Sequence, residues 1–146
     1  MTPQGATAYA PLIASSAHRY RVPADILDSL LYVESGFNPA AFHRNTNGSV
    51  DRGIAQINSA AHPHVTAQQA DNPAFAIPYA AQILASNRQR CGSWSGALQA
   101  YNSGSCTGAP GYAARVLGQS TRISWTRVAV LIGGAALFLV VLEAIT

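Results

Sequence analysis

The last part of the chain differs in composition from everything before it. The fifteen residues 128–142 carry no charged or strongly polar side chain, whereas the sequence up to about Gln119 mixes apolar residues with Ser, Asn, Arg, Gly and Pro. A chain of 146 residues has room for one domain of ordinary size. The contrast therefore predicts a globular domain over residues 1–120 and a separate segment over residues 121–146.

The apolar segment predicts a C-terminal transmembrane helix that anchors the domain. About 20 apolar residues are needed to cross a bilayer, and residues 123–145 reach this length with two charged residues, Arg127 and Glu143. Trp125 and Arg127 precede the apolar run, as residues at a membrane interface do. The alternative is a buried core helix, although such a helix in a small domain normally shows a polar face.

The globular part predicts a mainly helical fold. Apolar spacing and helix-end signals mark helices at Tyr9–Tyr20, Pro23–Ser35, Pro73–Asn87 and Trp94–Tyr101, with a short last one at 112–117. The second has the clearest ends, because Pro23 suits a first helical position and Gly36 a C-terminal one. Asn47-Gly48 is a strong turn signal. The expected fold class is therefore all-α, or α+β at most through a small hairpin, plus the transmembrane helix.

The charge and the cysteines limit the partners. The net charge is +3, and the nine basic residues are all arginines without a basic run, so no nucleic-acid partner is expected. A solvated surface and attraction to an anionic polymer both remain open. Cys91 and Cys106 form no CxxC pair and lack His at zinc-ligand spacing, so neither a metal nor a cofactor is expected. A disulfide and two free thiols are both compatible with their spacing.

Glutamate is nearly absent from the chain, which contains Glu34 and Glu143 alone. Glu34 follows Leu30 by four positions and Leu31 by three, so on a helix it shares their apolar face. Burial raises the pKa of a carboxylate, and a carboxyl protonated near neutral pH can donate a proton to a glycosidic oxygen and take one back. The alternative is a helix-end glutamate that faces solvent or pairs with an arginine.

Several short motifs follow Glu34 in a fixed order. They are ESGFNP at 34–39, NTNGS at 45–49, GIAQIN at 53–58, DNP at 71–73, AAQIL at 80–84, AYNSG at 100–104, and Tyr112 with Val116 and Leu117. In this order they resemble lytic transglycosylases of the soluble, goose-type-lysozyme-like superfamily, over about residues 10–118. The NTNGS form is most similar to the small transglycosylases that accompany secretion and conjugation machines.

The resemblance implies a lysozyme-like fold with a cleft for a glycan strand of peptidoglycan. It also implies cleavage of the β-1,4 bond between N-acetylmuramic acid and N-acetylglucosamine, with the muramyl C6 hydroxyl attacking to give a 1,6-anhydro end. Glu34 would be the general acid and then the base, Ser35 and Tyr101 would orient its carboxyl, and Gln56 and Asn102 would line the cleft. The residues expected to bind or orient the substrate are Ser35, Gln56, Ile57, Tyr101, Asn102 and Tyr112.

Two positions leave alternatives open. The Met usual in the GLMQ motif of these enzymes is Ala55 here, which weakens one expected sugar contact and keeps a non-catalytic wall-binding protein in play. Asp51 is the sole acid of the central loop, and facing Glu34 across the cleft it would permit a lysozyme-type hydrolase, because hydrolysis uses two carboxylates. Otherwise Asp51 is a solvated turn residue. A transglycosylase needs one carboxyl, since the substrate supplies the nucleophile.

The two ends of the chain suggest a setting. The first 20 residues do not predict a signal peptide, and Arg122 and Arg127 before the apolar run would keep the domain in the cytoplasm. Peptidoglycan lies outside the cytoplasm. A membrane-anchored enzyme carried in a phage virion, which opens the wall for genome entry, avoids this conflict. A component of a conjugation or secretion apparatus is the alternative. The expected partners are peptidoglycan, a membrane, and virion or secretion-machine proteins.

Overall fold

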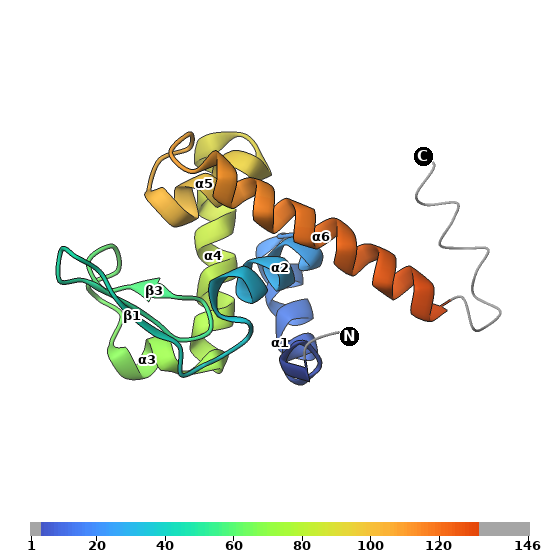
Figure 1. Cartoon of the computed structure of the whole chain (residues 1–146), viewed down its shortest axis with the longest axis horizontal. Coiled ribbons are helices and arrows are strands. Elements are labelled where there is room, and N and C mark those ends of the chain that lie inside the picture. Colours follow the sequence, from blue (N-terminus) through green and yellow to red (C-terminus); the bar gives the residue numbers. More distant parts are fainter. Residues whose placement is uncertain (1–3, 132–146) are drawn as a thin grey trace.

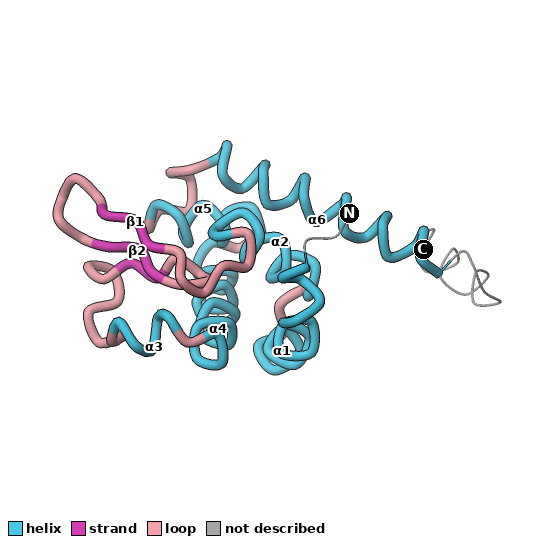
Figure 2. The backbone as a smooth tube through the Cα atoms, turned by 60° about the horizontal axis from the view of Figure 1, so that its bottom comes forward, coloured by secondary structure: helices cyan, strands magenta, loops and turns pink. Residues whose placement is uncertain are grey.

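The computed structural model describes residues 4–131, in which one small sheet lies at one side of a group of helices (Figure 1). The helices are α1 (Gln4–Tyr20), α2 (Ala24–Ser35), α3 (Ala67–Asp71), α4 (Pro73–Cys91), α5 (Trp94–Ser103) and α6 (Pro110–Leu131); the strands are β1 (Phe42–Arg44), β2 (Val50–Arg52) and β3 (Ile57–Asn58). In both views α4 lies in the middle. The sheet and α3 lie on one side of it, and α1 lies on the other (Figure 1, Figure 2).

Helix α2 forms the centre of the core. Leu27, Leu30 and Leu31 are fully buried, and α2 packs against α1 and α6. The helix ends at Gly36, whose positive φ of 61° lets its N–H bond back to the carbonyl of Tyr32. The expected helix over Pro23–Ser35 is confirmed to within one residue at its start. The face with apolar residues is therefore anchored in the core, and Glu34 stands one turn from its buried leucines.

The predicted hairpin is present, and a third strand joins it. β1 pairs antiparallel with β2 around the Asn47-Gly48 turn, in which Gly48 has a φ of +84°. β3 then pairs with β2, so that Asp51 lies opposite Asn58. No third strand was expected, because two residues are too few to show an alternating pattern. The domain is thus mainly helical with a three-stranded sheet.

The predicted transmembrane helix is wrong. Among residues 4–131, no helix has both the length and the apolar character to cross a membrane. The described part of the predicted span belongs to α6, whose sequence includes Arg115, Arg122 and Arg127. α6 also runs across the expected boundary between residues 120 and 121, and the hydroxyl of Ser120 donates to Asp25 Oδ2 of α2 at 2.5 Å. The remaining tail, 132–146, lies outside the described residues.

Gly53 offers a test of how tightly the sheet and α3 are joined. Its φ is +75°, and a Cβ added there would lie 1.9 Å from the carbonyl oxygen of Ala70 in α3. We expect Gly53→Ala to lower the free energy of unfolding by about 2 kcal/mol or more, because a main-chain clash adds to backbone strain. Urea denaturation measures this. Gly111→Ala is the matched control, since nothing lies within 4 Å of its added Cβ. Equal stability of the two variants would contradict the packing described.

Candidate active site

A cleft of about 750 Å³ opens between the hairpin and helices α2, α4 and α5. Its lining consists of Glu34, His43, Asn45, Thr46, Asn47, Ser49, Asp51, Gln56, Ile57, Asn58, Ala61, His62, Ile83, Asn87, Ala100, Tyr101, Asn102, Ser103 and Gly104. Most of the expected site residues are among them. Ser35 and Tyr112 lie outside the lining and contribute in other ways.

Glu34 is one of the two acids that line this cleft. Its side chain is partly buried, and the hydroxyl of Tyr112 on α6 donates a hydrogen bond to Oε1. The pKa of Glu34 is raised to about 7. Burial has the largest effect and raises the pKa, the hydrogen bond from Tyr112 lowers it, and the charges of Asp51 and Arg115 raise and lower it, respectively. Near neutral pH the carboxyl is therefore populated both with and without its proton.

Ser35 and Tyr101 were expected to orient the carboxyl, but their hydroxyls donate to main-chain carbonyls instead. The hydroxyl of Ser35 donates to the carbonyl of Ile54 at 2.8 Å, and that of Tyr101 donates to the carbonyl of Ala55 at 2.8 Å. Both side chains therefore hold the 53–56 turn against α2 and α5. Tyr112, also a candidate, is the residue that bonds the carboxyl.

The 53–56 turn positions the next cleft residues. Gln56 has a φ of +48°, and its amide Nε2 donates to the carbonyls of Gly53 at 3.0 Å and Ala41 at 3.3 Å. Ala55 is fully buried and absent from the cleft lining. The methyl at this position therefore packs in the core and does not line the cleft.

Asp51 is a strand residue of the cleft wall rather than a solvated turn residue. Its Oδ1 accepts a hydrogen bond from the amide of Asn58 at 2.7 Å, and its Oδ2 accepts one from the amide of Asn45 at 2.9 Å. Both asparagine amides also donate to the hydroxyl of buried Ser49, each at 3.1 Å. Asn45, Ser49 and Asn58 were missed as site residues, although they belong to the NTNGS and QIN motifs.

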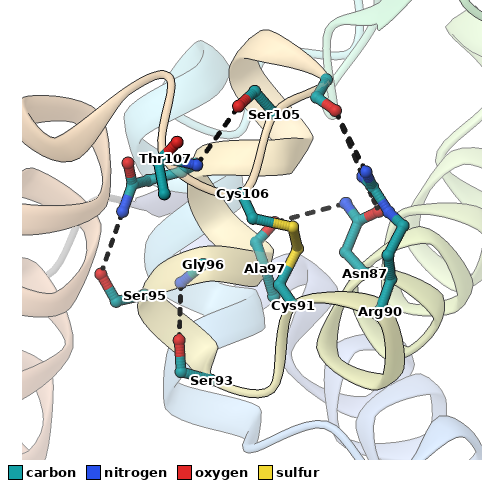
Figure 3. The surroundings of a disulfide bond; sticks show 12 residues. Asn87, Arg90, Cys91, Ser93, Ser95, Gly96, Ala97, Ser105, Cys106 and Thr107 are labelled. Atoms are coloured by element: carbon teal, nitrogen blue, oxygen red, sulfur yellow. Dashed lines mark hydrogen bonds between the residues drawn. A yellow bond between two sulfur atoms is a disulfide. The ribbon is translucent and has the colours of Figure 1, made fainter.

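Cys91 and Cys106 form a disulfide that joins the end of α4 to the loop after α5 (Figure 3). Between them lies α5, which supplies Tyr101 and Asn102 to the cleft. The amide of Asn87 adds a hydrogen bond to the carbonyl of Ala97 at 3.3 Å. Of the two alternatives that the spacing left open, a disulfide and two free thiols, the structure has the disulfide. Within residues 4–131, no three His, Cys, Asp or Glu side chains gather as metal ligands would.

Comparison with known proteins identifies the domain. Residues 11–109 match the family model described as the transglycosylase SLT domain. The chain belongs to this family. This SLT transglycosylase is also 33% identical over 95 residues to Protein IpgF of Shigella flexneri and to Protein IpgF of Shigella sonnei. The aligned region spans 61% of this chain and 62% of each relative. No solved structure gives a significant match. Tyr112, the partner of Glu34, lies beyond the matched residues.

The disulfide stabilises the α5 wall of this SLT transglycosylase. We expect the double variant Cys91→Ser, Cys106→Ser to lose about 3 kcal/mol of unfolding free energy, because a loop of this length is no longer closed in the unfolded chain. Urea denaturation with and without dithiothreitol measures it. The unaltered protein should lose a similar amount on reduction, whereas the double variant should not respond to the reductant. Equal stabilities throughout would argue against a stabilising bond.

The hydroxyl of Tyr112 should set the titration of Glu34. We expect Tyr112→Phe to raise the pKa of Glu34 above about 7, because the lost hydrogen bond favours the ionised carboxylate. Labelling with ¹³C-glutamate gives only two carboxyl signals to follow by NMR, since the chain contains two glutamates. Tyr32→Phe removes the hydroxyl of an exposed tyrosine and should leave the midpoint unchanged. A lowered or unchanged midpoint in Tyr112→Phe would refute the assignment.

Proposed function

We propose that this SLT transglycosylase cleaves peptidoglycan at the β-1,4 bond between N-acetylmuramic acid and N-acetylglucosamine and forms a 1,6-anhydro end. The observation that carries the proposal is the carboxyl of Glu34, which lies in a large cleft and has a pKa of about 7. A group that is to donate and later accept a proton works best with a pKa near the working pH. The family match supports the substrate class.

The reaction needs one carboxyl used twice. Protonated Glu34 donates its proton to the glycosidic oxygen as the bond from that oxygen to the muramyl C1 breaks, and positive charge develops on the ring. The ionised Glu34 then takes the proton of the muramyl C6 hydroxyl while O6 forms a bond to C1. The carboxyl ends protonated again, and no water is consumed. Burial raises the pKa of the Tyr112 hydroxyl, so it stays a hydrogen-bond donor to the carboxylate throughout.

Asp51 is the second acid that lines the cleft. Each of its carboxylate oxygens already accepts a hydrogen bond from an asparagine amide, from Asn58 and Asn45. These two bonds hold the carboxylate in place against the cleft wall. We assign Asp51 an electrostatic role: its negative charge raises the pKa of Glu34 and favours positive charge on the sugar ring.

The other candidate residues shape the cleft. Ser35 and Tyr101 hold the 53–56 turn, and through it they place Gln56 and Ile57 in the wall along which the glycan strand would lie. Asn102 faces this wall from α5. We place the reaction at the cell wall, where the substrate is. The setting in phage genome entry depended on a transmembrane tail, so it is not part of the proposal.

Glu34→Gln should abolish cleavage while the fold stays intact. The amide keeps the shape of the side chain but cannot transfer the proton, so we expect the rate to fall by about 100-fold or more. Digestion of purified peptidoglycan followed by mass spectrometry of the released muropeptides measures it. Glu143→Gln makes the same chemical change at the other glutamate and should keep full activity. Activity of Glu34→Gln within tenfold of the unaltered enzyme would refute the role of this residue.

The same digest separates the three reaction classes. Muropeptides with 1,6-anhydro ends support the proposal. Products one water heavier would assign the chain to hydrolases, and Asp51→Asn should then stop the reaction. A digest without new chain ends would instead show a wall-binding protein without turnover.

A further inference from the structure

Two histidines share one tyrosine hydroxyl at the edge of the cleft. The oxygen of Tyr79 on α4 lies 2.9 Å from Nδ1 of His62 and 3.0 Å from Nε2 of His64. The ring of His62 meets that of Tyr79 edge-on at 5.4 Å, and Phe75 stacks on the other side of Tyr79 at 5.3 Å. His62 lines the cleft, whereas His64 is exposed. The proposed reaction uses none of these side chains.

The number of protons on these three groups restricts how they can bond. Tyr79 has one hydroxyl proton, so it can donate to one imidazole and must accept from the other. In the first arrangement His64 donates through Nε2–H to Tyr79, and Tyr79 donates to Nδ1 of His62. The second arrangement reverses both bonds. The first leaves His62 with a proton on Nε2, and the second leaves Nε2 as a bare acceptor.

Two separate reasons favour the first arrangement. When both imidazoles are neutral, it places the proton of each on Nε2, which is the more stable position in free histidine. When the pair carries an extra proton, the first arrangement puts the charge on exposed His64 and the second puts it on His62. Burial and the neighbouring His64 both lower the pKa of His62, which disfavours the second. In either charge state, His62 therefore keeps a proton on Nε2.

We infer that Nε2–H of His62 is a fixed donor to the acetamido carbonyl of a sugar in the cleft, positioned through Tyr79 and His64. This inference rests on the proposed function and names a further substrate-binding residue for it. Among the described lining residues, Glu34 and Asp51 are acids and none is Lys or Arg, so a neutral acceptor fits better than a carboxylate of a peptide stem. No hydrogen bond within residues 4–131 is recorded to Nε2 of His62.

The surroundings of His62 also suit an acetamido group. Ala61 precedes it in the chain, and Ile83 follows Tyr79 by one helical turn on the same face of α4. Both line the cleft. A cleft lined by a donor and by apolar side chains offers one contact for the carbonyl oxygen of an acetamido group and another for its methyl. A free sugar hydroxyl would use the donor alone.

The test compares His62→Asn with His62→Gln. An asparagine amide reaches the place of Nδ1 and keeps the bond to Tyr79, whereas a glutamine amide reaches the place of Nε2 and keeps the donor in the cleft. Binding of chitotetraose, which is neutral and N-acetylated, is measured by calorimetry in the full-length chain carrying Glu34→Gln. We expect His62→Asn to weaken binding about fivefold, as the loss of one neutral hydrogen bond does, and His62→Gln to retain it within about twofold.

Two further measurements decide the inference together with the binding test. The effect of His62→Asn should disappear with the glucosamine tetramer, which lacks acetyl groups, and NMR of ¹⁵N-labelled histidine should find the proton of His62 on Nε2. A purely structural role would give the opposite order, with asparagine better tolerated than glutamine, and would overturn the inference. So would a proton on Nδ1, or no binding of chitotetraose by the Glu34→Gln protein. None of these measurements needs cleavage, so their failure is distinct from a failure of the proposed reaction.

Discussion

The burial of one carboxyl at the end of α2 is the constraint on which the site depends. Glu34 stands one turn beyond Leu30 and Leu31, which are fully buried, so the helix cannot turn this side chain away without exposing its core face. Burial raises the pKa, and the Tyr112 hydroxyl stabilises the ionised form by a smaller amount. If the Glu34 carboxyl were better solvated, it would stay ionised and could not donate a proton. If the Tyr112 hydroxyl did not bond to it, the carboxyl would stay protonated and could not accept one.

The 53–56 turn of the cleft wall is held by side chains that bond to main chain. Ser35 and Tyr101 approach the 53–56 turn from α2 and α5, and their hydroxyls hold neighbouring carbonyls, those of Ile54 and Ala55. The glycine that opens this turn lies against the carbonyl of Ala70. Three elements distant in the sequence thus fix one short segment. Such a wall is rigid where a flexible loop would have to be ordered by substrate.

Sequence patterns could predict those parts of the structure that depend on local signals. Helix α2 followed from Pro23, the spacing of its leucines and Gly36, and the hairpin from Asn47-Gly48. β3 was too short to show a pattern. The disulfide could not be decided, because its formation depends on α5 bringing two Cα atoms within 5.5 Å. For the site, motifs selected most cleft residues but misassigned the partners of Ser35 and Tyr101, since a hydroxyl's acceptor depends on tertiary contacts that spacing does not encode.

Helix α6 shows why composition alone misled at the C-terminal end. The apolar composition beyond residue 120 suggested a membrane span, whereas the described part of that span continues a helix that begins at Pro110 with buried Tyr112, Ala113 and Val116. Tyr112 reaches Glu34 across 78 positions of sequence, and Ser120 reaches Asp25 across 95. Both bonds join α6 to α2, one near the start of α2 and the other near its end. The docking of α6 therefore contributes to the proton affinity of Glu34, and a change that loosens this helix should alter the titration of Glu34 before it disturbs the cleft lining.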